Sequence, residues 1–277
     1  LFHMITHAFF KALLFLGAGS VIDACHHEQD IFKMGGLLKK MPVTAVTFLL
    51  GLIALCGVYL TAGYHSKDAI IEAAWVEGNT PVFGLLLFGA FLTALYMGRL
   101  FFVAFLGKPN SEHAEHAKES SLVMTLPLIV LAVAAVIGGF EWFYPTGAHS
   151  GAFAGQLHAV HDAVKEAGAK TLMLGVTSAS WVLGLALAAG FYGFGRGSDR
   201  LRDTLPGLYA FLRGRLWFDE LYNAYVRQVQ QRFADILAFL DLVVIELFLV
   251  RGSAGLVNAV GMLGRYLHVG SLHGYVY

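Results

Sequence analysis

The chain has 277 residues, of which 57% are hydrophobic and only 14% charged, with 19 basic and 19 acidic side chains. Soluble domains carry about 25% charged residues, so this composition excludes an ordinary water-exposed surface and indicates an α-helical protein in a lipid bilayer. The balanced charge gives no indication of a nucleic-acid partner, and we expect none.

Five apolar runs follow one another along the chain, each long enough to span a bilayer, which takes about 17–25 residues. They cover residues 1–22, 43–62, 82–106, 122–144 and 171–194. Strand-like alternation is absent, which disfavours a barrel. The chain starts inside an apolar helical run, without the charged segment of a signal peptide, so we interpret it as a fragment of a longer protein.

The first run carries ionisable side chains at helical spacing. His3, His7 and Lys11 recur every four residues and therefore line one face of a helix, with the hydroxyl of Thr6 nearby. Charged groups in a membrane helix usually face the bundle interior or a wet cavity. Because imidazole titrates near neutral pH, such a row is suited to passing protons along ordered water. The alternatives are structural pairing of these groups, or a segment that does not span.

Lys67 and Asp68 follow a glycine- and hydroxyl-rich stretch, residues 61–66, that separates two apolar segments. Non-helical backbone at membrane depth occurs only where protein or water satisfies it, and broken helices of this kind mark ion sites in transporters. We therefore expect a helix break here with an ionisable site beside it. The alternative is a surface loop with a solvated lysine. Glu72 either joins the site or caps its far side.

Three further features have more than one interpretation. Arg99 is the only charged residue of the run 82–106, and it either snorkels to the surface or pairs with an acid. Residues 112–116 and 158–162 resemble loose metal-ligand sets, but both lie in polar loops without the scaffold of a metal site. Cys25 and Cys56 are far apart, whereas an iron–sulfur cluster takes four thiolates. We expect no metal, redox centre or other cofactor in this chain.

The tail, residues 216–268, has no proline, and its apolar residues recur at helical spacing. A vertical span through residues 233–250 would bury Asp235, Asp241 and Glu246 at about 2.5–3.5 kcal/mol each. An amphipathic helix along the membrane interface keeps these acids in water. At 1.5 Å per residue, about fifty residues extend roughly 75–80 Å, farther than a bilayer is thick. A sixth span through residues 233–250 is the alternative.

Basic residues favour one side of the predicted spans. The side reached after the first span holds Lys33, Lys39, Lys40, Lys108, Lys118, Arg196, Arg200, Arg202, Arg213 and Arg215, and the other side holds Lys165 and Lys170. Because basic loops remain cytoplasmic, the first side is predicted to be the cytoplasm, or the matrix of a mitochondrion. The sequence thus predicts an all-α, polytopic membrane helix bundle with one broken helix and a long C-terminal lateral amphipathic helix.

Several motifs carry a family resemblance. His-Met-Ile-Thr-His-Ala-Phe-Phe-Lys at residues 3–11 and Glu-Gln-Asp-Ile-Phe-Lys-Met-Gly-Gly at residues 28–36 resemble the antiporter-like membrane subunits of respiratory complex I. Those subunits are similar to Mrp-type sodium/proton antiporters and membrane-bound hydrogenases. Phe-Asp-Glu-Leu-Tyr at residues 218–222 and the long tail resemble the largest of these subunits.

The resemblance implies an organisation of the chain. Family members pair inverted five-helix repeats, each with a broken helix. Residues 1–106 would be the end of the second repeat, with three spans of which the middle one is broken, and residues 107–195 would add two transmembrane helices. Residues 196–277 would form a cytoplasmic-side loop and the lateral helix, which braces other membrane-arm subunits.

The resemblance also implies roles for individual residues. Lys67 and Asp68 match the family's Ser-Lys-Asp on the second broken helix, next to the proton outlet. His7 and Lys11 match the half-channel on the preceding helix, and Arg99 has a family counterpart. One departure is that the family's acid directly after Ser-Lys-Asp is Ala69 here, which weakens the case for Glu72 as a member of the site.

The implied function is proton translocation through the membrane arm of NADH:quinone oxidoreductase, coupled to electron transfer in other subunits. The implied location is the inner membrane of a bacterium, or that of a mitochondrion. The alternatives are a subunit of an Mrp-type sodium/proton antiporter, a subunit of a membrane-bound hydrogenase, or a purely structural membrane brace.

Overall fold

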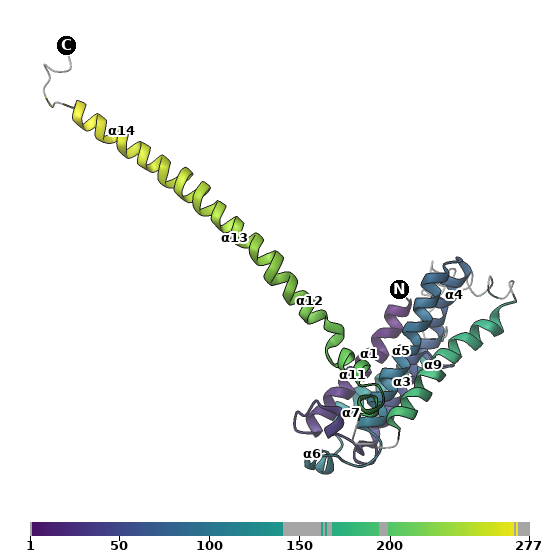
Figure 1. Ribbon diagram of the computed structural model, residues 1–277. Coiled ribbons are helices and arrows are strands. Elements are labelled where there is room, and N and C mark those ends of the chain that lie inside the picture. Colours follow the sequence, from purple (N-terminus) through teal and green to yellow (C-terminus); the bar gives the residue numbers. More distant parts are fainter. Residues whose placement is uncertain are drawn as a thin grey trace. The chain divides into compact units, whose positions relative to one another are not determined.

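The computed structural model describes residues 2–140, 162, 164, 168–193, 199–268 and 270, and in these residues it is helical without any strand. The chain forms two compact units, Leu1–Thr204 and Leu205–Tyr277. Figure 1 shows packed helices in the first unit and one extended helical rod in the second. The prediction of an all-α membrane bundle is confirmed.

Five apolar helices build the first unit. Three are long and apolar enough to cross a bilayer, namely α1 (Phe2–Ala24), α5 (Thr80–Ala104) and α9 (Lys170–Tyr192). Two are apolar but shorter, namely α3 (Pro42–Cys56) and α7 (Leu122–Ile137). All five overlap the predicted runs, and the long three agree within two residues at each described end. Helix α7 begins as predicted at residue 122 but ends at Ile137, before the predicted end at residue 144. The last residues of two predicted runs, 141–144 and 194, lie outside the described residues.

The prediction of one span over residues 43–62 is wrong at its end, because α3 stops six residues earlier. Gly57 adopts a left-handed φ of +81° and donates its N–H to the carbonyls of Ala54 and Ile53, which terminates the helix. The fifteen residues of α3 extend about 22 Å, less than the roughly 30 Å hydrocarbon core.

The helix resumes beyond this stop. Residues 57–61 are not helical, and helix returns at Ala62. It continues through a π-helical turn, η2 (Tyr64–Asp68), into α4 (Ala69–Val76). The predicted break exists, but it covers residues 57–61, whereas most of the stretch 61–66 is helical.

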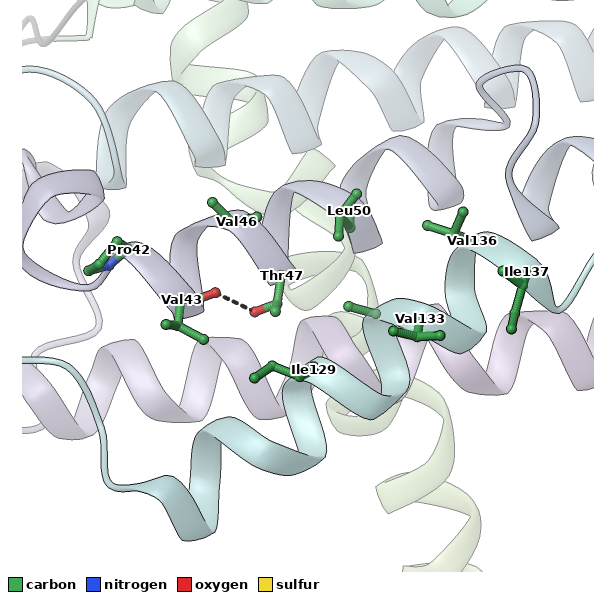
Figure 2. Close-up of a pocket in the computed structure, with 10 residues that line it drawn as sticks. Pro42, Val43, Val46, Thr47, Leu50, Ile129, Val133, Val136 and Ile137 are labelled. Carbon is green, nitrogen blue, oxygen red and sulfur yellow. Dashed lines mark hydrogen bonds between the residues drawn. The ribbon is translucent and has the colours of Figure 1, made fainter.

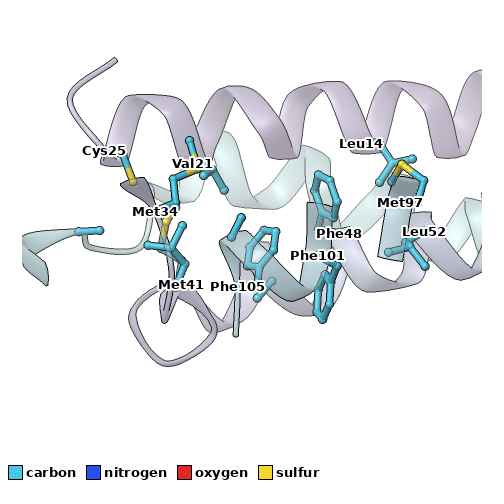
Figure 3. Close-up of a cluster of buried hydrophobic side chains, with 14 of the residues drawn as sticks. Leu14, Val21, Cys25, Met34, Met41, Phe48, Leu52, Met97, Phe101 and Phe105 are labelled. Carbon is cyan, nitrogen blue, oxygen red and sulfur yellow. The ribbon is translucent and has the colours of Figure 1, made fainter. Parts of the chain in front are cut away.

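Aromatic and aliphatic side chains from α1, α3 and α5 form the main core (Figure 3). The ring of Phe105, just past the end of α5, lies 5.2 Å from the ring of Phe48 and 5.1 Å from that of Phe101, between centroids. Gly17 of α1 faces Phe48 so closely that a Cβ there would meet the ring at 2.9 Å. The small residue therefore lets α1 and α3 approach each other.

Helices α5 and α9 pack along each other through small residues. A Cβ on Gly184 would lie 2.5 Å from the carbonyl oxygen of Phe91 and 2.7 Å from Cβ of Ala94, and one on Gly98 would lie 2.8 Å from Cβ of Ala188. Helices in lipid associate through such close backbone contact, because lipid tails are as apolar as the side chains.

Two of the connections predicted for one side of the membrane meet at one end of the first unit. The N–H groups of Gly35, Gly36 and Leu38 donate to the carbonyls of Ala104, Leu106 and Phe105, respectively. The connection after α1 thus pairs with the end of α5. Of the basic residues counted for the two sides, Lys165 and Arg196 lie outside the described residues.

A carboxylate from the connection before α7 caps α3 at this same end. Glu119 accepts from the N–H of Val43 at 2.7 Å, from that of Thr44 at 3.3 Å and from the Thr44 hydroxyl at 2.6 Å. The Thr44 hydroxyl also lies 3.2 Å from that of Ser20 in α1. A negative charge is favourable at a helix N-terminus, where the first N–H groups lack partners.

The loop after α1 carries a second cluster of charge. The carboxylate of Glu28 accepts from the N–H of Asp30 at 3.0 Å, from Nζ of Lys33 at 2.9 Å and from the N–H of Gln29 at 3.0 Å. These bonds hold the pKa of Glu28 below its usual range. Both partners of the Glu28–Lys33 pair are reached by solvent, as expected for a loop outside the bilayer.

The second unit is a helix that runs from Phe218 to Leu267. Helical backbone continues without interruption through α12 (Phe218–Tyr225), η5 (Val226–Gln230), α13 (Gln231–Leu240), η6 (Asp241–Gly252) and α14 (Ser253–Leu267). The predicted tail helix is confirmed, and its fifty or so residues extend about 75 Å. Its lateral orientation in the membrane plane stays a prediction.

Four short helices complete the described part of the chain. They lie in the connections and before the tail, as α2 (Leu37–Lys40), α6 (Glu112–His116), α10 (Arg200–Thr204) and α11 (Pro206–Arg213). The 3-10 turns η1 (Ile31–Lys33) and η4 (Arg215–Trp217) adjoin them. Arg215, Leu216 and Trp217 all adopt left-handed φ angles, which turns the chain immediately before the tail helix.

The close contact of α5 and α9 yields a stability prediction. We expect Gly184→Ala to lower the free energy of unfolding by about 1–3 kcal/mol, because the new methyl group overpacks the interface. Gly175 lies on the same helix with no atom within 4 Å of a Cβ, so Gly175→Ala is the matched control. Thermal unfolding of the purified protein in detergent measures both. Equal midpoints of thermal unfolding for the two variants would contradict the close packing of α5 against α9 at Gly184.

Candidate functional site

Ser66 joins helix α1 to the π-helical turn η2. The hydroxyl of Thr6 donates to Oγ of Ser66 at 2.7 Å, and Nδ1 of His3 lies 3.0 Å from the same oxygen. Ser66 in turn donates to the carbonyl of Ala62 at 2.9 Å. Thr6 and Ser66 are almost fully buried. Two of the predicted residues, His3 and Thr6, are therefore connected to the segment that carries Lys67.

The row of ionisable residues continues along α1 away from Ser66. The rings of His3 and His7 are 5.7 Å apart between centroids, and His7 meets Phe10 edge-on at 5.2 Å. Nζ of Lys11 lies 5.5 Å from the centre of the Phe15 ring. Proton transfer needs heavy atoms about 2.6–3.2 Å apart or one bridging water. A path along this row therefore depends on water between the side chains.

Lys67 uses a carbonyl that the helix break leaves without a helical partner. The carbonyls of Ile53 and Ala54 accept from the chain immediately after α3, whereas that of Leu55 accepts from Nζ of Lys67 at 3.4 Å. The last carbonyls of a helix carry partial negative charge. The C-terminal end of α3 therefore favours an ammonium group at Lys67, which is half-buried.

Asp68 is buried, with 9% of its surface exposed, and points toward α9. The hydroxyl of Thr177 donates to its Oδ2 at 3.1 Å. A Cβ on Gly57 would lie 3.6 Å from both Oδ1 of Asp68 and Cδ of Lys67, so both side chains lie against the break. In the described part of the chain, Lys67 and Asp68 form no ion pair with each other.

The close approach of the two helical segments depends on Gly63. A Cβ at this position would lie 1.7 Å from the carbonyl oxygen of Ala54, which no side chain tolerates. Glycine here lets the resumed helix pass directly against the end of α3. The glycine that the sequence suggested as a helix breaker is thus a contact point, and Gly57 is the residue that ends the helix.

A cavity of about 360 Å³ opens beside Asp68 at the end of the unit opposite Glu119. Glu72 lines it together with Asp68, which agrees with the interpretation that Glu72 joins the site. Its remaining wall comes from the break, η2, the turn after α7, the segment before α9 and the start of α9, namely Tyr59, Leu60, Tyr64, His65, Phe140, Asp162, Val164, Lys170 and Leu174. Asp68 thus lies at the boundary between the buried turn and a polar cavity.

Arg99 does not join the other predicted residues. Its guanidinium forms an ion pair with Asp199 at 3.1 Å and stacks near the rings of Phe32 at 5.3 Å and Tyr192 at 5.2 Å. These partners come from η1, the end of α9 and the segment after it. Of the two interpretations offered by the sequence, pairing with an acid is confirmed.

Two residues that hydrogen-bond to the predicted site residues were not among the candidates from the sequence. Ser66 precedes Lys67 in the motif itself, and its hydroxyl is the link to α1. Thr177 lies in α9, about a hundred residues away, and only the fold brings it to Asp68. The signal that was available is a cluster of hydroxyl residues, Thr177 to Ser180, within an otherwise apolar span, since small polar residues in membrane helices favour helix–helix hydrogen bonds.

The loose metal-ligand set at residues 112–116 forms no metal site with the residues that the structure covers. No group of three histidine, cysteine or carboxylate side chains there is arranged for a metal ion. In the set at residues 112–116, His113 packs against the ring of His26 at 4.9 Å. In the other set, residues 158–161 lie outside the described residues.

Comparison with known proteins shows a similarity that covers most of these residues. Residues 1–93 match the family described as NADH:quinone oxidoreductase/Mrp antiporter, TM. This segment contains six of the seven predicted site residues, all but Arg99. NADH-quinone oxidoreductase subunit L of Rickettsia conorii is 35% identical over an alignment of 301 positions. The alignment covers 99% of this chain and 45% of the relative.

Subunit L proteins of other bacteria are more similar over shorter segments. That of Pseudomonas aeruginosa is 51% identical over 141 residues, covering 50% of this chain and 22% of the relative. That of Escherichia coli is 49% identical over 140 residues, with the same coverage. The chain spans less than half the length of the curated relatives it matches.

Proposed function

Because this chain is a relative of NADH-quinone oxidoreductase subunit L, and its residues 1–93 belong to the NADH:quinone oxidoreductase/Mrp antiporter family, we propose that it translocates protons in the membrane arm of complex I. Electron transfer in other subunits supplies the energy, and this chain contributes no redox centre or cofactor of its own. Its partners are the other membrane-arm subunits, and its location is the inner membrane of a bacterium.

The proposed organisation follows the family. Residues 1–106 are the end of the second antiporter-like repeat, residues 107–195 add two further transmembrane helices, and residues 196–277 comprise a cytoplasmic-side loop and a lateral helix. The tail helix supports this assignment by its length and by the three acids within it, Asp235, Asp241 and Glu246. An interfacial helix of this kind braces neighbouring subunits.

One observation carries the proposal. The buried hydrogen bond between Thr6 and Ser66 connects the ionisable row of α1 to the turn that holds Lys67 and Asp68. A polar connection between two membrane helices is costly unless it is satisfied, and here it joins titratable groups on both sides. It therefore supports a path for protons better than it supports a purely structural brace.

Lys67 is the residue in this path that holds the proton. Its ammonium group donates to the carbonyl of Leu55, while Asp68, next to it along the chain, borders the polar cavity. A proton released by Nζ of Lys67 reaches Asp68 through water and leaves by this cavity. Moving one charge against 100 mV takes about 2.3 kcal/mol, so the proton affinity of the site must change by several kcal/mol during turnover.

The antiporter members of the matched family define the second candidate. A subunit of an Mrp-type sodium/proton antiporter would use the same residues 1–93 without electron transfer, and a hydrogenase subunit would couple them to another reaction. The similarity along 99% of the chain to subunit L favours complex I. Proton uptake that depends on NADH oxidation separates these functions.

We expect Lys67→Ala in the full-length protein to abolish or strongly reduce proton translocation while the complex still assembles. Lys67→Arg gives little recovery, because arginine stays protonated. The measurement is proton uptake by membrane vesicles during NADH oxidation, with assembly followed on native gels. Lys33→Ala is the control, since Lys33 is exposed and pairs only with Glu28. Normal uptake in an assembled Lys67→Ala complex would remove Lys67 from the proton path.

Thr177 is expected to act as a positioning residue for Asp68. Thr177→Val removes the hydroxyl but keeps the shape of the side chain, and Thr177→Ser keeps the hydroxyl. A hydrogen bond to a charged group contributes about 1.5–3 kcal/mol, so the valine variant should translocate protons at least severalfold more slowly at an unchanged content of assembled complex. The serine variant should recover most of the rate. Equal rates for the two variants would show that the hydroxyl has no role.

A further inference from the structure

An apolar groove runs between α3 and α7 on the outside of the first unit (Figure 2). Its volume is about 610 Å³, and side chains from the first part of α3 and the second part of α7 line it, namely Pro42, Val43, Val46, Thr47, Leu50, Ile129, Ala132, Val133, Val136 and Ile137. The only polar side chain among them is that of Thr47, whose hydroxyl already donates to the carbonyl of Val43 at 2.9 Å. The groove therefore has no group to bind a polar ligand.

The lining side chains are open to their surroundings. Val46 is 52% exposed, Ile129 43% and Val133 51%. In a protein that crosses a bilayer, such residues face hydrocarbon, and a groove of this kind is filled either by a lipid chain or by another helix. The charged groups at the end of the groove distinguish these two occupants.

One end of the groove lies beside basic residues. Pro42 lies at the end where the basic connections meet, and Lys39 and Lys40 are exposed just before it. Lys118 is also exposed, and the next residue, Glu119, hydrogen-bonds to the start of α3. None of these three lysines forms an ion pair within the described residues. The carboxylate of Glu119 already accepts hydrogen bonds from the first N–H groups of α3.

We propose that this groove binds an anionic phospholipid. One acyl chain lies along the groove between α3 and α7, and the phosphate of the headgroup lies among Lys39, Lys40 and Lys118. The basic residues predict that this end faces the cytoplasm, and the cytoplasmic leaflet is the one that carries anionic lipids. Basic pockets between membrane helices on that side bind such headgroups. The site is independent of the proton path.

Photoreactive lipids test the proposal. The complex that contains the full-length protein is placed in phosphatidylcholine nanodiscs with a trace of phosphatidylglycerol, or of phosphatidylcholine, bearing a diazirine in one acyl chain. Cross-linked peptides are quantified by mass spectrometry. We expect phosphatidylglycerol to label residues 42–50 and 129–137 severalfold more than phosphatidylcholine does.

Matched variants separate the two parts of the site. Lys39→Gln with Lys40→Gln should lower phosphatidylglycerol labelling about tenfold or more, because each basic residue near the surface strengthens binding about fivefold, whereas Lys108→Gln, on an exposed lysine at the same end, should not. Val133→Trp should block both lipids by filling the groove. Val182→Trp on α9, at a similar exposure of 47%, is its control.

Two results would overturn the assignment. Equal labelling by the two lipids, unaffected by the lysine substitutions, would show that the headgroup is not recognised. Absence of labelling in the groove, while the exposed face of α9 is labelled, would show that a protein segment fills the groove in the complex.

Discussion

The need to satisfy backbone groups where a membrane helix stops governs the site in this protein. No water competes for a carbonyl in hydrocarbon, so each unpaired one costs several kcal/mol. At the end of α3, the N–H of Gly57, in its left-handed turn, donates to two carbonyls. A third carbonyl, that of Leu55, accepts from Nζ of Lys67. The structural requirement of the break thereby places a basic side chain inside the protein, at the position that we propose holds the translocated proton.

The surrounding packing maintains this arrangement. Gly63 allows the resumed helix to contact the carbonyl of Ala54, and Ser66 then reaches α1 through Thr6. On the other side, the small residues between α5 and α9 bring Thr177 to Asp68. The site is therefore assembled from helices that lie far apart in the sequence, and α9 lies outside the segment that the family match covers. A change in the packing of α9 would therefore alter the hydrogen bond between Thr177 and Asp68.

The sequence predicted those features that depend on local pattern. Apolar length located α1, α5 and α9 within two residues, and the spacing of His3, His7 and Lys11 placed them on one helix. Features that depend on close contact between helices could not be predicted from the sequence. Gly57 and Gly63 look alike in the sequence, yet one ends a helix and the other permits a contact. Likewise, Arg99 has a partner, Asp199, that no spacing rule identifies.

The central claim is that the buried hydroxyl of Ser66 links the ionisable row of α1 to Lys67. The direct test is the number of protons translocated per NADH oxidised in vesicles that contain Ser66→Ala. The control is Thr47→Ala, which removes a buried hydroxyl that bonds only within its own helix. The account predicts a lower ratio for Ser66→Ala alone, with assembly and NADH oxidation retained. An unchanged ratio in the assembled Ser66→Ala complex would contradict it.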